Sequence, residues 1–394
     1  MPNRREFILQ TTIGGSLAAS GLRLSRADGK EQQTSAKPLN ILIVGGTGFI
    51  GPHFVAAAVN RGHKVAVFNR GKTEEDLPEE VERLIGDRNG DFRSLEGRTW
   101  DAVLDLSAYV PVWVRSLGQA LKHRVKHYTF ISTNAVYKNP GANASGTNES
   151  SETLSFEGTG DPYAKDGGGG TYGALKVLCE KEAEKQYPGK VLAVRPGYIV
   201  GPGDPQKRFT YWVARLERGG EILSPGNPLQ PVQFVDVRDV AEWIVRMAES
   251  GETGTYNALG PDYLMSMCEM LGGIRGIFSS PSRLNWVAIP WIRGQDIVSS
   301  ELLDWDIWRF CTEDAISSAK ACAKGLVFRP LSTTATDVLN WYKAQPAEER
   351  SVAFTRFKKD DSGAWKKIDV SWTEVEQRER EVITRWRAHI IRMM

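Results

Sequence analysis

The stretch ILIVGGTGFIG, residues 41–51, decides the fold of this chain. Its apolar first half indicates a buried strand, and Gly45, Gly48 and Gly51 follow at the spacing G-x-x-G-x-x-G. The first glycine permits a tight turn, the second lets the backbone approach a pyrophosphate, and the third permits close packing of a helix on the strand. The pattern predicts a dinucleotide site at a helix N-terminus, where free N–H groups and the helix dipole favour anions. The same candidate site includes the residues between these glycines, Thr47, Phe49 and Ile50.

Outward from this stretch, short apolar segments alternate with helical ones from Pro38 onward. Such alternation is typical of a parallel sheet covered by helices on both faces. We expect strands at 39–44, 64–68, 81–85, 102–106, 127–132 and 191–195, and helices at 52–60, 113–121 and 172–186. The chain is therefore predicted to be of the α/β class, with a Rossmann-type doubly wound parallel sheet and a smaller C-terminal substrate-binding region.

The domain organisation follows from the same pattern, since 394 residues suffice for one large α/β unit with an appended region. We expect residues 38–203 to form an NAD(P)-binding Rossmann domain and residues 204–394 to form mainly the substrate-binding region, with about 232–250 packing back on the Rossmann domain. Residues 139–170, rich in Gly, Ser, Thr and acidic side chains, are expected to form a long surface loop beside the site. Residues 356–367 are expected to be a polar, exposed insertion.

The first residues have the pattern of an export signal. Arg4 and Arg5 precede Leu9 at the twin-arginine spacing, and a mildly apolar, Gly/Ala-rich stretch follows. We interpret residues 1–27 as a twin-arginine signal peptide and residues 28–37 as a linker. This interpretation predicts recognition by the twin-arginine export machinery and a periplasmic or other extracytoplasmic location. Without a functional leader the protein would be cytoplasmic.

Composition narrows the function classes. Hydrophobic residues at 41% and charged residues at 25% are globular values, and the net charge of +2 argues against a dedicated nucleic-acid binder. No uninterrupted apolar run approaches the roughly 20 residues that span a bilayer. The four cysteines form no CxxC pattern, so no zinc site is expected. The sequence leaves open whether Cys311 and Cys322 pair after export or stay as buried thiols.

The ends of the next strands supply candidates for the rest of the dinucleotide site. The second strand ends at Asn69 and Arg70, where NAD-selective sites place a carboxylate that accepts from the ribose hydroxyls. Without that carboxylate a 2′-phosphate meets no repulsion and can pair with the guanidinium, so NADP is favoured over NAD. The alternative is that Arg70 is merely solvated. Asp87 is the expected neighbour of adenine, and Ser107 and Ala108 are expected to line the floor near the nicotinamide ribose.

Two residues of the predicted helix 172–186 have the chemistry of an acid/base pair. Tyr172 and Lys176 stand four residues apart, hence on one helical face. An ammonium near a phenol stabilises the phenolate and is expected to lower the pKa of Tyr172, which makes it usable near neutral pH. Lys176 is also expected to hydrogen-bond the cofactor ribose. The end of the fifth strand, residues 130–137, offers hydroxyl groups at the carboxyl edge of the sheet, where ligands of such folds bind.

Taken together, these motifs resemble the extended short-chain dehydrogenase/reductase superfamily in its NAD-dependent epimerase/dehydratase branch. The resemblance covers roughly residues 39–261 and rests on GGTGFIG at 45–51, STNAVY at 132–137, Tyr172 with Lys176, RPG at 195–197 and FVDVRDV at 234–240. It implies that Tyr172 is the catalytic acid/base and Lys176 its helper. It also implies that Thr133 hydrogen-bonds the reacting oxygen, with Ser132 as the competitor for that role. A homodimer is common for this family.

Two departures from that family narrow the substrate. The arginine that holds the diphosphate in nucleotide-sugar epimerases is replaced by Val232, and a common asparagine is replaced by Tyr198. Both replacements weaken the case for a nucleotide-diphosphate sugar. Arg208, Arg215 and Arg238 could still bind an anion, and the alternative for each is a solvated or salt-bridged role.

These inferences favour an NAD(P)-dependent enzyme that performs hydride and proton chemistry at a carbinol or carbonyl carbon of a sugar-like or other small hydroxylated substrate. Because no nicotinamide pool recharges an exported protein, we favour epimerase/dehydratase-like chemistry with a retained cofactor. One alternative is a conventional reductase with exchangeable NADPH. Another is a non-catalytic dinucleotide-binding or RNA-binding protein.

Overall fold

The computed structural model describes residues 37–72, 77–138, 140, 146–294, 315–359 and 365–393. The chain divides into two units, Met1–Thr34 and Ser35–Met394, and all described residues belong to the second. The expected signal peptide and Cys311 lie outside the described residues. Among the described cysteines, Cys179, Cys268 and Cys322 carry free thiols.

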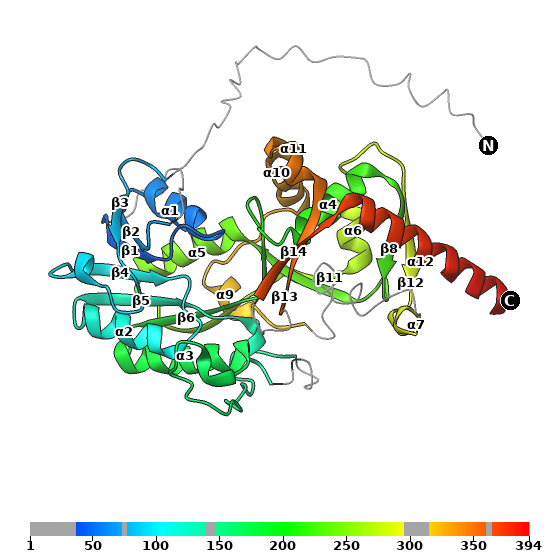
Figure 1. The fold of residues 1–394 in the computed structure, drawn as a ribbon. Helices are drawn as coiled ribbons and strands as arrows, with labels where there is room; N and C mark the ends of the chain where they lie inside the picture. The colour runs from blue at the N-terminus through cyan, green and yellow to red at the C-terminus, as the bar shows by residue number, and fades with distance from the viewer. Residues whose placement is uncertain are drawn as a thin grey trace, which may run out of the picture. The chain divides into compact units, whose positions relative to one another are not determined.

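A seven-stranded parallel sheet forms the centre of the N-terminal half (Figure 1). Its strand order is β10-β6-β5-β4-β1-β2-β3, and every neighbouring pair is parallel. The strands are β1 (Asn40–Val44), β2 (Lys64–Asn69), β3 (Glu82–Ile85), β4 (Trp100–Asp105), β5 (Val125–Ile131), β6 (Val191–Pro196) and β10 (Gly254–Ala258). This arrangement confirms the predicted α/β class and Rossmann-type sheet.

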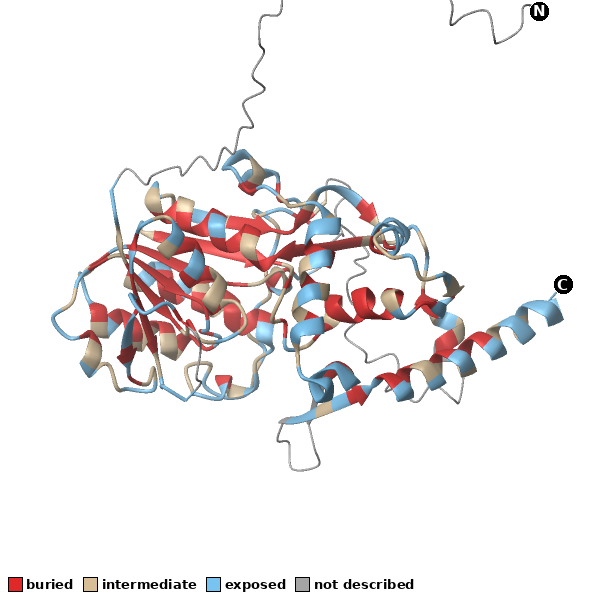
Figure 2. Ribbon diagram, turned by 90° about the horizontal axis from the view of Figure 1, so that it is seen from above, coloured by how far each residue is buried: buried red, intermediate tan, exposed pale blue. Residues whose placement is uncertain are grey.

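Helices cover both faces of this sheet because its strands are apolar on both sides. Successive residues of a strand point to opposite faces, and in β1 Ile41 and Ile43 join one buried cluster whereas Leu42 and Val44 join another. The first cluster is completed by α1 (Gly51–Asn60) and α5 (Val237–Glu249), and the second by α2 (Pro111–Leu121) and α3 (Tyr172–Gln186). Figure 2 shows the buried residues along the strands and on the helix sides that face them.

Two elements from beyond residue 204 belong to the central sheet and the helices that cover it. Helix α5 packs against α1 through the shared cluster that contains Phe54, Val240 and Trp243. Strand β10 pairs with β6 in parallel, from Gly254 with Leu192 to Ala258 with Pro196, and so adds the seventh strand at one edge of the sheet. The sequence pattern had indicated six strands and did not indicate β10.

The C-terminal region forms a second core from short sheets and helices. The small sheets are β11-β9-β7, β12-β8 and the hairpin β13-β14. The strands are β7 (Tyr198–Val200), β8 (Gly220–Pro225), β9 (Pro231–Asp236), β11 (Gly260–Ser266), β12 (Ser282–Val287), β13 (Val352–Lys359) and β14 (Trp365–Ser371). The helices are α4 (Arg208–Arg218), α6 (Met267–Arg275), α7 (Ile289–Arg293), α9 (Ala319–Ala323), α10 (Leu331–Ala344), α11 (Ala347–Ser351) and α12 (Trp372–Met393). Residues 356–367, expected to be an insertion, lie mostly in the strands of the hairpin.

The segment between β5 and α3 contains little regular structure in its described part. It includes the 3₁₀ helices η2 (Asn134–Val136) and η3 (Gly167–Gly169) and a bridge between Tyr137 and Thr153. Gly167 lies against Leu175 at the start of α3, which places the end of this segment next to the predicted acid/base pair. In the part of the chain that the structure describes, no helix is long and apolar enough to cross a bilayer.

Candidate active site

The three glycines of the first βα turn occupy positions that a larger residue would disturb or fill. Gly45 has φ +89°, and a Cβ there would collide with Ser107. A Cβ on Gly51 would collide with the backbone of Gly46, so this glycine lets helix α1 start close to the turn. A Cβ on Gly48 would meet nothing within 4 Å, which leaves open space above the turn. The geometry fits the expected roles of a tight turn, close packing and approach to a pyrophosphate.

The start of helix α1 carries no side-chain cap, although the N–H of Gly51 bonds to the carbonyl oxygen of Gly48 at 2.9 Å and Pro52 has no N–H. Its N-cap residue, Ile50, has no side chain that bonds the first N–H groups, and the first turn carries no acidic residue. The first N–H groups of a helix have no partner inside the helix and carry partial positive charge. Together with the space above Gly48, this helix end fits the phosphates of a dinucleotide.

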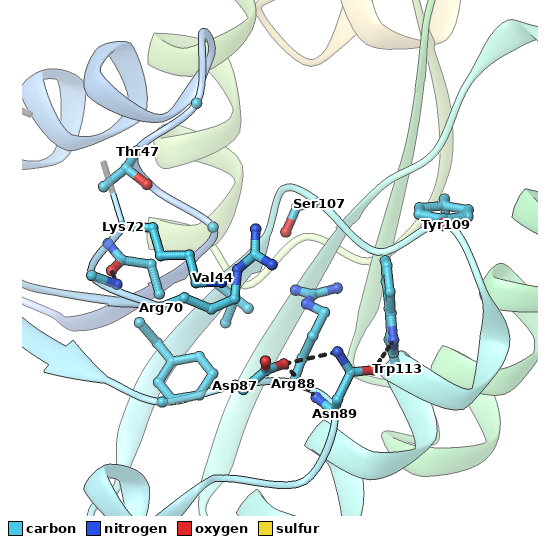
Figure 3. A pocket seen from close by; sticks show the side chains of 16 residues that line it. Val44, Thr47, Arg70, Lys72, Asp87, Arg88, Asn89, Ser107, Tyr109 and Trp113 are labelled. Atoms are coloured by element: carbon cyan, nitrogen blue, oxygen red, sulfur yellow. Dashed lines mark hydrogen bonds between the residues drawn. The ribbon is translucent and has the colours of Figure 1, made fainter. Parts of the chain in front are cut away.

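A cavity of about 430 Å³ lies at the carboxyl edge of the sheet (Figure 3). The predicted cofactor residues that line it are Gly45, Thr47, Gly48, Asn69, Arg70, Asp87 and Ser107. The remaining predicted site residues do not line it: Phe49, Ile50, Gly51, Ala108, Thr133, Tyr172 and Lys176. Its wall also includes residues that the sequence did not select, namely Lys72, Arg88, Asn89, Tyr109 and Trp113. Arg88 and Asn89 directly follow Asp87, so the strand-end argument that selected Asp87 could have found them.

Two cations border this cavity at the end of β2. The side chain of Asn69 is fixed because its Oδ1 accepts a hydrogen bond of 2.7 Å from the N–H of Gly71. Arg70 and Lys72 line the same wall, and within the described residues no hydrogen bond or ion pair engages either side chain. Their positive charge is therefore available to an anionic ligand group at this end of the cavity.

The opposite wall is organised by side-chain hydrogen bonds (Figure 3). Asp87 accepts from the backbone N–H of Asn89 at 2.8 Å and from its Nδ2 at 2.9 Å. Trp113 Nε1 donates to Asn89 Oδ1 at 3.1 Å. The guanidinium of Arg88 lies 5.2 Å from the centre of the Trp113 ring, which favours a cation–π contact. These contacts hold a flat, partly apolar wall that suits a purine ring.

Lys176 is almost completely buried beside this cavity, with 3% of its surface exposed. Its Nζ donates to the carbonyl oxygens of Ala108 at 2.7 Å and Ile131 at 2.6 Å. Burial lowers the pKa of Lys176 to about 8, because the charged form loses hydration. Two of the three ammonium protons are thus engaged at the carboxyl edge of the sheet, and one remains for a ligand.

Tyr172 lies on the same face of α3 and is exposed. The Nζ of Lys176 is 5.8 Å from the centre of its ring, and 54% of the Tyr172 surface is accessible. The surrounding protein desolvates the phenol and raises the pKa of Tyr172. The expected lowering of this pKa by Lys176 is therefore wrong for the protein by itself, since desolvation and the nearby Cys179 both raise it. The phenol is protonated at neutral pH and accessible to a substrate.

The two candidate hydroxyls after β5 have different environments. Ser132 is buried and donates to Glu180 Oε1 at 2.5 Å, and Arg195 holds the same carboxylate at 2.7 and 3.0 Å. Thr133 caps η2, where its Oγ1 accepts from the N–H of Ala135 at 3.2 Å. The hydroxyl of Ser132 is thus used within the protein, whereas that of Thr133 donates only a long hydrogen bond of 3.5 Å to Asn134 Oδ1.

A close helix contact brings Tyr172 to the turn that Thr133 caps. Gly173 follows Tyr172, and a Cβ on it would collide with the carbonyl oxygen of Ala135 in η2. Only a glycine therefore allows the first turn of α3 to approach η2 this closely. The sequence did not indicate this role, because the contact joins Gly173 to Ala135, which belongs to another element.

The residues that depart from the family pattern are all engaged within the protein. Val232 is fully buried in β9, and Tyr198 lies under the guanidinium of Arg208 at 4.9 Å. The three arginines considered for anion binding form ion pairs: Arg208 with Asp204 at 3.9 Å, Arg215 with Glu379 at 2.7 Å, and Arg238 with Asp236 at 2.7 Å and Asp337 at 2.5 Å. The salt-bridged alternative accounts for all three.

Residues 41–258 match the NAD dependent epimerase/dehydratase family. The chain is similar to the chloroplast stem-loop binding protein of 41 kDa b from Arabidopsis thaliana, with 27% identity over 257 residues, 59% of this chain and 63% of that protein. It thus spans less than two thirds of that relative. It is also similar to a dTDP-4-dehydro-6-deoxy-D-allose reductase from Streptomyces sp, with 24% identity over 278 residues, 62% of this chain and 82% of that enzyme.

Among solved structures, the chain is similar to the Bordetella bronchiseptica enzyme WbmH in complex with NAD+. The TM-score is 0.56 at 18% identity, and the match covers 78% of this chain and 99% of that one. This likeness supports the fold. The family match extends over more than half of the chain, from the glycine turn through β10. The chain therefore belongs to the NAD dependent epimerase/dehydratase family.

Proposed function

We propose that this enzyme performs hydride and proton chemistry at a carbinol or carbonyl carbon of a sugar-like or other small hydroxylated substrate, with Tyr172, Lys176 and Thr133 as its catalytic residues. One observation carries the proposal: an exposed phenol stands next to a buried ammonium that bonds to Ala108, whose two chain neighbours line a cavity fit for a dinucleotide. The sugar-like substrate is suggested by the name of the Streptomyces relative.

The three side chains have separate roles in this proposal. A bound nicotinamide supplies or accepts the hydride at the substrate carbon. Tyr172 donates its phenolic proton to the carbonyl oxygen as that carbon is reduced, and takes a hydroxyl proton in the reverse direction. Thr133 donates a hydrogen bond to the same oxygen as its charge changes. Lys176 uses its remaining proton to hold the nicotinamide ribose and stabilises the phenolate after proton transfer.

The adenosine end of the cavity leads us to favour NADP over NAD. Asn69 stands where a ribose-binding carboxylate is usual, and Arg70 and Lys72 supply two positive charges beside it. The structure of WbmH contains NAD+, which favours NAD for this chain. The preference between NADP and NAD is therefore to be measured directly. Titration with NADPH and NADH should show tighter binding of NADPH, and equal or tighter binding of NADH would refute the NADP preference.

We propose that the substrate lacks a nucleotide diphosphate. Val232 is fully buried, and Arg238 is held by two carboxylates. No arginine is left at the positions considered for a diphosphate, because those of the C-terminal region are ion-paired. A panel of free aldoses and ketoses, tested beside UDP- and dTDP-sugars, would check this. Turnover of the nucleotide sugars alone would overturn the proposal.

The leader supports a proposal about location. We infer that the twin-arginine export machinery moves the folded protein out of the cytoplasm with its cofactor bound, and that the enzyme regenerates this cofactor in each reaction cycle. Removal of residues 1–27 should then keep the protein in the cytoplasm of its native cell. A homodimer is part of the same proposal, and its mass in solution is measurable by light scattering.

The decisive experiment is to denature the freshly purified protein and to identify the released nucleotide by mass spectrometry. We expect near-stoichiometric NADP or NAD. The matched variant is Gly48→Val, which places a branched side chain in space that is free of protein atoms and should leave the fold intact but empty. An empty wild-type protein that turns over added NADPH would instead support a conventional reductase with exchangeable cofactor.

A second candidate function, RNA binding, rests on the plant relative, whose name states that it binds stem-loops. In that case the dinucleotide would be a structural ligand and the Tyr172 phenol would be dispensable. Filter binding of a stem-loop RNA to wild-type protein and to Tyr172→Phe separates the two functions. Tight, salt-sensitive RNA binding that is equal in both proteins, without any turnover, would favour the RNA-binding function.

A further inference from the structure

Asp105, the last residue of β4, is a completely buried carboxylate that the roles above do not use. Its Oδ1 accepts from the backbone N–H groups of Ser107 at 3.3 Å and Ala108 at 3.2 Å. The Nη2 of Arg88 donates to the same oxygen at 3.0 Å. Its Oδ2 accepts from the hydroxyl of Tyr128 at 2.9 Å. A buried carboxylate needs such donors, and here they come from three separate parts of the sheet edge.

The turn that Asp105 holds touches both halves of the candidate site. Ser107 lies against Gly45, since a Cβ on that glycine would collide with its side chain. The carbonyl oxygen of Ala108 accepts the hydrogen bond of 2.7 Å from Lys176 Nζ. The turn thus links the phosphate-binding glycine loop to the ammonium of Lys176, and the carboxylate of Asp105 fixes its conformation through the two N–H groups.

Arg88 bonds to this carboxylate and also lines the cavity, where Figure 3 shows it beside Asn89 and Trp113. Its side chain is 14% exposed, lines the cavity and stacks near the ring of Trp113. Its Nη2 faces Asp105, whereas its Nη1 is buried and has no hydrogen-bond partner among the described residues. An unpartnered buried donor is costly unless a ligand satisfies it. Arg88 therefore has one group for Asp105 and one for a molecule in the cavity.

We propose that Asp105 and Arg88 are a pair of positioning residues that connects the adenosine end of the cavity to the catalytic lysine. The carboxylate holds the turn so that the carbonyl of Ala108 meets Lys176. The guanidinium balances the buried carboxylate and donates to the adenosine part of the cofactor. Neither side chain touches the reacting atoms. The inference rests on the proposed function, because it takes Lys176 to hold the nicotinamide ribose.

The charges around Lys176 give this pair a measurable signature. The titratable groups that face it are Tyr172, Cys179 and Glu180 on α3, Asp105 on β4, Tyr128 on β5, and Arg88 after β3. Burial lowers the pKa of Lys176 to about 8; Cys179, Asp105 and Glu180 act to raise it, and Arg88 acts to lower it. Loss of the Asp105 charge and loss of the Arg88 charge must therefore move the titration of Lys176 in opposite directions.

The test is the affinity for NADPH and NADH, measured by fluorescence titration at pH values on both sides of 8. In the wild type, binding should weaken as Lys176 loses its proton above pH about 8. In Asp105→Asn, which keeps the size and the acceptor of the side chain, the midpoint of this loss should fall by about half a pH unit or more. In Arg88→Gln the midpoint should rise by a similar amount.

The matched control is Arg70→Gln, which removes the same charge from the opposite wall of the same cavity without a contact to Asp105. It should weaken NADPH binding at every pH and leave the midpoint in place. If Asp105→Asn does not fold, Arg88→Gln alone tests the inference. Only a rise in the pH at which half of the NADPH affinity is lost would then support the proposed roles of Asp105 and Arg88. Unmoved midpoints, or an equal loss of affinity at every pH, would overturn the inference. A wild-type protein that binds neither nucleotide would refute the proposed function itself.

Discussion

Charged side chains at the carboxyl edge of the central sheet and in the region beyond residue 204 differ in whether a protein group pairs with them. At the sheet edge, Arg70 and Lys72 border a cavity without a partner among the described residues, and Nη1 of Arg88 is likewise unpaired. In the C-terminal region, Arg215 and Glu379 form an ion pair with side-chain exposures of only 5% and 2%.

This difference separates a site from a scaffold. Both partners of a buried ion pair lose their hydration, and only their attraction and hydrogen bonds within the protein offset this loss. The pair is therefore stable only in one packing arrangement. A cation next to a cavity can instead recover its interactions from a ligand. Arginine content therefore does not identify the anion site of this protein. The cations that mark it, Arg70 and Lys72, have no carboxylate partner among the described residues, whereas Arg88 on the opposite wall is paired with Asp105.

The largest effect that would test this separation is expected from Tyr172→Phe. Loss of the phenolic proton should reduce turnover by about 10²- to 10⁴-fold and leave cofactor affinity within about twofold. Nicotinamide absorbance with a panel of aldoses and ketoses measures the turnover. Tyr163→Phe is the control, because the hydroxyl of Tyr163 bonds Glu182 at 2.9 Å and has no role in the site. Equal activity of Tyr172→Phe and wild type would remove the phenol from the mechanism.

The next effect concerns the scaffold. Arg215→Met leaves the buried carboxylate of Glu379 unpaired and should lower the free energy of unfolding by about 3–5 kcal/mol. Arg218→Met breaks the more exposed pair with Glu376 and should cost about 0–1 kcal/mol. Urea denaturation measures both values. Similar losses in the two variants would show that burial does not distinguish these pairs.

The burial of Lys176 predicts how stability changes with pH. Between about pH 8 and the unfolded value of about 10.4, the unfolded chain holds a proton that the folded protein has released. Stability should therefore rise with pH in this window, by about 2 kcal/mol relative to Lys176→Met over one and a half pH units. Unfolding free energies of both proteins at pH 8 and above provide the measurement. Parallel curves would mean that Lys176 titrates as an exposed lysine does.

The smallest effect is expected at the adenosine end of the cavity. Arg70→Ser should weaken NADPH binding about tenfold and leave NADH binding unchanged, because it removes one charge-assisted contact to a 2′-phosphate. Arg98→Ser is the control, since Arg98 pairs with Glu82 at 2.8 Å outside the cavity wall. If the variant loses affinity for both nucleotides equally, Arg70 contributes general attraction and not selectivity.

Sequence patterns within single segments predicted most strands of the central sheet and the helices that cover it. The helix 172–186 has the bounds expected from its pattern, and β1 precedes and α1 follows the glycine turn as expected. These elements depend on apolar periodicity and on glycine positions within about ten residues. Strand β10 was not indicated, because its edge position and short length give no distinct pattern.

The parts of the site that the sequence did not indicate depend on contacts between distant segments. Asp105 and Arg88 are 17 positions apart and meet only because β4 and the loop after β3 end at the same edge. The collision that excludes a side chain at Gly173 involves Ala135, from another element. The pKa of Tyr172 also followed the surrounding protein and not its helical neighbour.

The sequence by itself determined the parallel sheet, the glycine turn and the residue types that can bind a dinucleotide and move a proton, because these follow from spacing along one segment. Only the tertiary structure decided which charges are available. It paired Arg208, Arg215 and Arg238 with carboxylates, buried Lys176 against two carbonyl groups and left Arg70 at the cavity wall. The physical reason is that desolvation and ion pairing depend on what packs around a group, and that is set by segments far away in the chain.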